Sequence, residues 1–155
     1  EHSTAQGMTS LLVTPARGRL AVARLVVLAG TGLVFASVLV GASLAACPTT
    51  STAALWAGGR TVVWLTAALL LAAGLGEALR SVIGAATVAV VLVILAPQLA
   101  MFAGDIARWL PGQAAQIWMA AAAPQTDVTA AGLAALGWTT AAQVAGIARL
   151  LRADA

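Results

Sequence analysis

The side chains that most often carry catalysis are scarce in this sequence and poorly placed for it. Cys47 is the single cysteine, so the chain can form neither an internal disulfide nor a thiolate metal cluster. His2 is the single histidine, and a serine–histidine–carboxylate triad would depend on this terminal side chain. The sequence has no lysine, which excludes a phosphate-binding loop of the Gly-Lys-Ser/Thr kind. We therefore expect no enzymatic site, no metal and no cofactor bound by this chain.

The remaining charged residues predict local ion pairs rather than catalysis. Glu77 and Arg80 stand three residues apart at an expected turn, where they can form an ion pair. Asp105 and Arg108 repeat the same spacing at the start of a later segment. The net charge of +3 comes from eight arginines and needs no nucleic-acid partner to explain it.

Long apolar segments must position these residues, because 61% of the chain is hydrophobic and only 8% is charged. A bilayer core about 30 Å thick needs roughly 20 mainly apolar helical residues to cross it. Four segments meet this requirement, and the alternating pattern of β-barrel strands is absent. We expect an all-α, polytopic transmembrane bundle, with residues 1–19 as a cytoplasmic segment and residues 20–155 as the transmembrane domain. The four predicted spans are residues 25–46, 61–79, 82–104 and 128–148.

The arginines predict an orientation, because cytoplasmic ends of membrane helices collect basic residues. With the N-terminal segment and the C-terminus in the cytoplasm, six arginines are inside and only Arg60 and Arg108 are outside. Residues 47–59 and 105–127 are then the outer segments, and their tryptophans suit the headgroup boundary. The second outer segment predicts a helical hairpin broken at Pro111 and Gly112, although a surface loop is the alternative.

Two further patterns lie inside the predicted spans. Pro97 and Gln98 could line a translocation path, or they could mark a helix kink in which Gln98 satisfies the freed carbonyl. Small residues recur along the spans, which is typical of helices that pack closely in lipid. These glycines are Gly30, Gly41, Gly74, Gly84, Gly132, Gly137 and Gly146.

The polar lead of the chain carries the most specific pattern. It resembles the cytoplasmic loop of type-2 ABC exporter permeases from bacteria, and the C-terminal tail resembles that of actinobacterial members. The departures from the family pattern are Ala5 and Met8, where Gly and a basic residue are common. The residues that match are Glu1, Thr4, Leu11, Pro15, Arg17, Ala23 and Arg24.

This resemblance implies that the lead is a coupling helix that docks on a separate cytosolic ABC ATPase. The ATPase-coupling residues would be Glu1, Thr4, Leu11, Leu12, Pro15 and Arg17, and ATP with Mg²⁺ would bind to the partner ATPase. The resemblance also implies a bacterial plasma-membrane location and a second permease copy, or a related permease. Because such permeases normally have six spans, we expect further spans before Glu1.

Other interpretations of the chain stay open at this stage. The lead could instead be an amphipathic anchor whose arginines bind anionic lipid. The whole chain could be a small, non-transporting membrane scaffold or assembly protein. The sequence does not indicate which substrate a transporter of this kind would export.

Overall fold

Three long apolar helices dominate the computed structural model of the chain. They are α2 (Arg17–Ala45), α3 (Thr52–Leu79) and α8 (Gln125–Arg152). Each contains a segment long and apolar enough to cross a membrane, which is compatible with a multi-pass membrane protein. All regular secondary structure in the described residues is helical, which confirms the predicted all-α class. The structure describes residues 17–47, 51–79, 81–95, 98, 102, 104–120 and 125–152.

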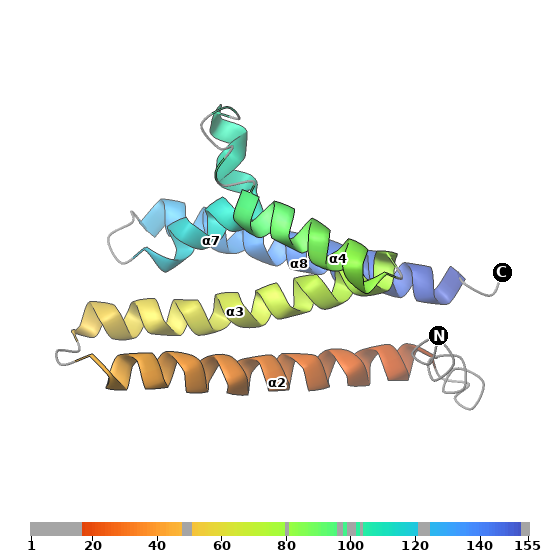
Figure 1. Cartoon of the computed structure of the whole chain (residues 1–155), viewed down its shortest axis with the longest axis horizontal. Coiled ribbons are helices and arrows are strands. Elements are labelled where there is room, and N and C mark those ends of the chain that lie inside the picture. Colours follow the sequence, from red (N-terminus) through yellow and green to blue (C-terminus); the bar gives the residue numbers. More distant parts are fainter. Residues whose placement is uncertain are drawn as a thin grey trace.

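The three long helices lie side by side with different relative directions (Figure 1). Helices α2 and α3 are antiparallel, because Arg24 near the start of α2 contacts Glu77 near the end of α3. Helices α3 and α8 are parallel: Thr139 lies against Ala67, and farther along Gly146 lies against Glu77. We call the end where α2 begins and α3 and α8 finish the arginine-rich end. Arg24 of α2 and Arg149 of α8 lie at this end, where they contact the last turns of α3.

The parallel arrangement requires residues 80–124 to return across the bundle, since α3 finishes at the arginine-rich end and α8 starts at the other. Part of this return is α4 (Val82–Val90), continued by the π-helical turn η1 (Val91–Leu95). Ser81 starts α4 at the predicted position, because its hydroxyl accepts a hydrogen bond from the Gly84 amide at 3.1 Å. Together α4 and η1 are only about 21 Å long at 1.5 Å per residue. This described helix is too short to confirm the third predicted span, 82–104.

The long helices extend beyond the spans that hydropathy predicts. Helix α3 begins at Thr52 rather than at residue 61, because the Ser51 hydroxyl accepts from the Ala54 amide and caps the first turn. Arg60 consequently lies within α3, not in an outer loop. Helix α2 likewise begins at Arg17 and includes three arginines. Charged side chains near helix ends are tolerated because their long stems let the charge reach the interface.

Two short helices precede α8. The 3₁₀ helix η2 (Gly104–Trp109) is followed by α7 (Pro111–Met119), so the break lies at Leu110, and Pro111 and Gly112, where the sequence predicts the break, belong to α7. Pro111 occupies the first turn of α7, where its missing N–H costs no hydrogen bond. Helix α7 then packs against both α8 and α3. The placement of η2 and α7 outside the membrane stays a prediction.

Candidate functional site

Glu77 is the residue at which the three long helices meet. Its Oε1 atom lies 2.9 Å from Nη1 of Arg24, so it joins α3 to α2 by an ion pair. On its other side Glu77 packs against Gly146 of α8, where a Cβ atom would lie only 2.9 Å from Glu77 Cβ. Glycine is therefore the residue that lets α8 approach the glutamate. The carboxylate connects helices that are far apart in the sequence.

Arg149 adds a second connection at this end. Its Nη1 atom donates a hydrogen bond to the carbonyl oxygen of Ala78, in the last turn of α3. Carbonyls in the last turn of a helix have no partner within that helix, and a basic side chain is a suitable donor for them. We call Arg24, Glu77, Gly146 and Arg149 the charged joint. The joint ties the start of α2 and the end of α8 to the end of α3.

The rest of the α3–α8 interface is unusually close. A Cβ atom on Gly74 would lie 2.7 Å from the backbone carbonyl carbon of Ala142, so the two backbones are nearly in contact. Two polar side chains of α8 are also buried here. Thr139 donates to Ala135 O at 2.9 Å within α8, and Gln143 Nε2 donates across the interface to Leu70 O. Small residues and satisfied polar groups are typical of helix pairs in lipid.

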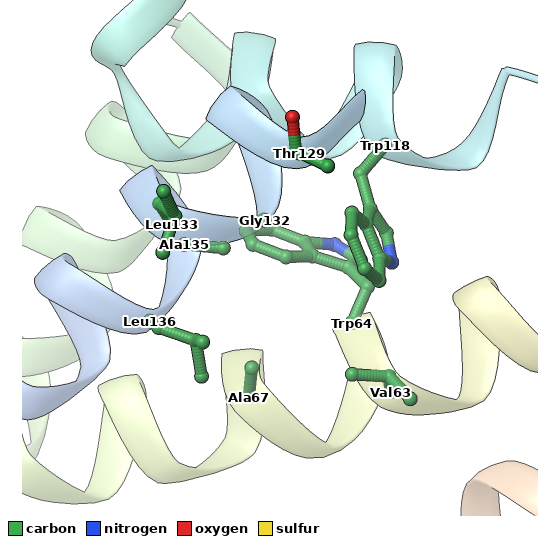
Figure 2. Close-up of a pocket in the computed structure, with 9 residues that line it drawn as sticks. All are labelled: Val63, Trp64, Ala67, Trp118, Thr129, Gly132, Leu133, Ala135 and Leu136. Carbon is green, nitrogen blue, oxygen red and sulfur yellow. The ribbon is translucent and has the colours of Figure 1, made fainter. Parts of the chain in front are cut away.

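Away from the charged joint, α3, α7 and α8 surround an apolar cavity of about 440 Å³ (Figure 2). The indoles of Trp64 and Trp118 lie next to each other in its wall. Trp118 is held in place because its Nε1 donates to the carbonyl oxygen of Arg60 at 2.9 Å. Its ring also lies over Gly132, where an added Cβ would be 2.5 Å from the indole. The lining residues are Val63, Trp64, Ala67, Trp118, Thr129, Gly132, Leu133, Ala135 and Leu136.

Most of the residues predicted to couple to an ATPase lie outside the part of the chain that the structure describes. Glu1, Thr4, Leu11, Leu12 and Pro15 lie outside the described residues. Arg17 is the first residue of α2, which places the lead directly before the helix that carries Arg24. The C-terminal residues 153–155 are not described either.

The predicted translocation-path residues are only partly described. Pro97 lies outside the described residues, and Gln98 is exposed. Among the described residues, Gln98 belongs neither to the charged joint nor to the cavity lining. Their assignment to a path stays a prediction.

The two ion pairs predicted from spacing, Glu77–Arg80 and Asp105–Arg108, stay predictions, and nothing is described of the Asp105 side chain. Arg80 lies outside the described residues, while Glu77 pairs with Arg24 on another helix. Arg108 has its guanidinium carbon 5.7 Å from the centre of the Trp109 ring, within cation–π range. Local spacing finds charged residues but does not identify their tertiary partners.

Comparisons with protein-family models, curated proteins and solved structures give no significant match.

Proposed function

We propose that the chain is the membrane-spanning permease subunit of an ATP-driven ABC exporter in the bacterial plasma membrane. Residues 1–19 dock on a cytosolic ATPase that binds ATP and Mg²⁺, and both this lead and the C-terminus are cytoplasmic. The resemblance of the lead to coupling loops supports this function. The three long apolar helices support the membrane-embedded part of it.

The observation that carries the proposal is the charged joint near the start of α2, the helix that comes next in the sequence after most of the lead. Arg24 lies within two turns of the start of α2. Through Glu77 a displacement of this end of α2 reaches α3, and through Gly146 it reaches α8. An ATPase that moves the lead would therefore move all three long helices at their shared end.

The outer face of α2 is the surface on which a second permease copy would pack. Among the described residues no atom lies within 4 Å of a Cβ added to Gly30 or Gly41, and Ser37 is exposed on the same helix. Exposed Val34 and Val38 lie between these small residues. Small residues let helices approach closely in lipid, which makes this face suitable for a second copy or a related permease.

Replacing Leu11 and Leu12 with Asp tests the docking of the lead. We expect the ATPase to dissociate while the chain stays in the membrane, because the variant removes the apolar contact. The matched control places the same two Asp residues at Thr9 and Ser10, and it keeps the ATPase bound. The measurement is ATPase co-purification from solubilised membranes, together with the ATP turnover of the complex.

Two results would contradict the proposal. If the leucine variant retains a fully responsive ATPase, the lead serves only as a lipid anchor. If the unmodified chain purifies without any ATPase, the protein is a membrane scaffold.

A further inference from the structure

We infer that the cavity between α3, α7 and α8 binds one hydrocarbon chain of a membrane phospholipid, with the lipid phosphate at Arg60. The site is separate from the proposed coupling role. It would exist equally in an exporter and in a scaffold, because it depends only on the chain being embedded in a bilayer.

The chemistry of the lining supports an alkyl chain. The nine lining residues are apolar except for Thr129. The inner wall is buried, with Trp64 only 7% and Ala135 7% exposed. The volume of about 440 Å³ is typical of a pocket that holds a small molecule, roughly 300–1,000 Å³. A polar ligand would lose its hydrogen bonds to water here and gain few in return.

The rim shows where such a chain would enter. Leu133, Leu136 and Val63 are 68%, 58% and 51% exposed, so the side chains around the opening are apolar and uncovered. Leu133 and Leu136 come from α8 and Val63 from α3, both helices long and apolar enough to span a bilayer. These side chains therefore face lipid hydrocarbon. A lipid chain can enter sideways without crossing water.

Arg60 supplies the charge that favours a phospholipid over an uncharged hydrocarbon. It stands one helical turn before Trp64 on α3, and residues four apart share a helix face. Its Nη1 contacts Ala120 O at 3.4 Å, which uses one of the five N–H donors of a guanidinium. The hydrogen bond from Trp118 to the Arg60 carbonyl fixes this turn beside the cavity. Guanidinium groups bind phosphate with two parallel hydrogen bonds.

The first experiment is photolabelling of the full chain in phosphatidylcholine vesicles. The probe is phosphatidylglycerol carrying a diazirine on one acyl chain, and mass spectrometry locates the adducts. We expect adducts concentrated on Trp64, Ala67 and Trp118. Adducts spread evenly over the exposed faces of α2 and α3 would overturn the site.

Cavity-filling variants provide the matched comparison. Ala67→Phe places a ring in the cavity and abolishes labelling of Trp64 and Trp118. Ala42→Phe adds the same ring to the exposed side of α2 and leaves labelling unchanged. Val63 is exposed at the cavity entrance, so Val63→Trp narrows the entrance with little effect on folding. This variant tests the same site if Ala67→Phe fails to fold. Unchanged labelling in a folded Ala67→Phe or Val63→Trp variant would reject the cavity as the binding site.

A second arm tests the headgroup. Arg60→Gln should lower labelling by the phosphatidylglycerol probe and leave labelling by an uncharged diacylglycerol bearing the same diazirine chain unchanged. An equal loss with both probes would show that Arg60 only supports the structure. No loss with either probe would show that the cavity recognises the hydrocarbon chain alone, which overturns the assignment of the phosphate to Arg60.

Discussion

The two interfaces of α3 are built differently. Helices α3 and α8 form a closely packed pair, whereas α2 is attached to α3 more weakly. Against α8, the backbone of Gly74 lies next to the backbone of Ala142, and the Gln143 side chain crosses the interface. Against α2, glycines meet the ends of side chains: an added Cβ on Gly32 would meet Leu69 Cδ2 at 2.9 Å. Backbone cannot move aside locally, whereas the end of a leucine can turn to another rotamer.

The ion pair between Arg24 and Glu77 is the main polar contact described between α2 and α3. It lies at the end of α2 that follows the proposed coupling lead. In the proposed coupling, α3 and α8 would move together as a closely packed pair, because their contact is between backbones, while α2 is attached to that pair through side-chain contacts and this ion pair.

The largest expected effect comes from Gly74→Ala. The added methyl group would overlap the Ala142 carbonyl group, and overpacking of this kind costs about 1–3 kcal/mol. The matched control is Gly30→Ala, because nothing lies within 4 Å of a Cβ there. The free energy of unfolding in mixed detergent micelles, followed by tryptophan fluorescence, gives both values. Equal stability of the two variants would contradict the close α3–α8 contact.

Gln143→Leu should have the next largest effect. The substitution removes the hydrogen bond to Leu70 O but keeps most of the side-chain volume in a buried position. Interhelical hydrogen bonds in membrane proteins contribute about 0.6 kcal/mol on average and up to about 1.7 kcal/mol. The same unfolding assay measures the loss, and Gln113→Leu on α7 serves as a control for removing an amide. If Gln143→Leu raises the free energy of unfolding, the amide makes no net contribution to holding α3 and α8 together.

The Arg24–Glu77 ion pair should contribute little to the free energy of unfolding. Its main effect should be to hold the first turns of α2 against α3. Arg24 is 59% exposed and Glu77 17% exposed, so water screens the pair, and we expect a coupling energy of about 0.2–1 kcal/mol. A double-mutant cycle with Arg24→Gln and Glu77→Gln measures this coupling. In either single variant, amide hydrogen exchange should rise in the first turns of α2 and stay unchanged in α8. Equal increases in both helices would mean that the joint stabilises the whole bundle rather than α2.

The sequence is sufficient to predict the all-α class and the three long apolar helices α2, α3 and α8, because hydrophobic composition alone indicates them. It predicts their ends less well. Ser51 extends α3 by nine residues beyond the hydropathy boundary at residue 61, through a local hydrogen bond that a hydropathy window does not detect. Arg60 is consequently a residue of the helix, and its carbonyl oxygen accepts the hydrogen bond from Trp118.

The sequence also predicts that glycines mark close packing, but not which ones. Gly74, Gly132 and Gly146 each face a neighbouring helix, whereas Gly30, Gly41 and Gly137 face none among the residues that the structure describes. The difference depends on the rotation of each helix about its axis, which is set by tertiary contacts. For the same reason, sequence spacing does not identify Arg24 as a partner of the Glu77 carboxylate.

The smallest expected effect comes from Gly32→Ala at the α2–α3 interface. The new methyl group meets Leu69 Cδ2 at 2.9 Å, but Leu69 is 39% exposed and its end can turn outward. Alanine also favours a helix over glycine by up to about 1 kcal/mol, which offsets the small rearrangement. We therefore expect a change within about 0.5 kcal/mol of zero, as for an ordinary surface substitution. The mixed-micelle unfolding assay compares this variant with Gly74→Ala, since each adds the same methyl group to one of the two interfaces of α3, Gly32 from α2 and Gly74 from α3 itself. A loss at Gly32 as large as that at Gly74 would show that α2 is held as rigidly as α8, and the coupling model would then lose its movable helix.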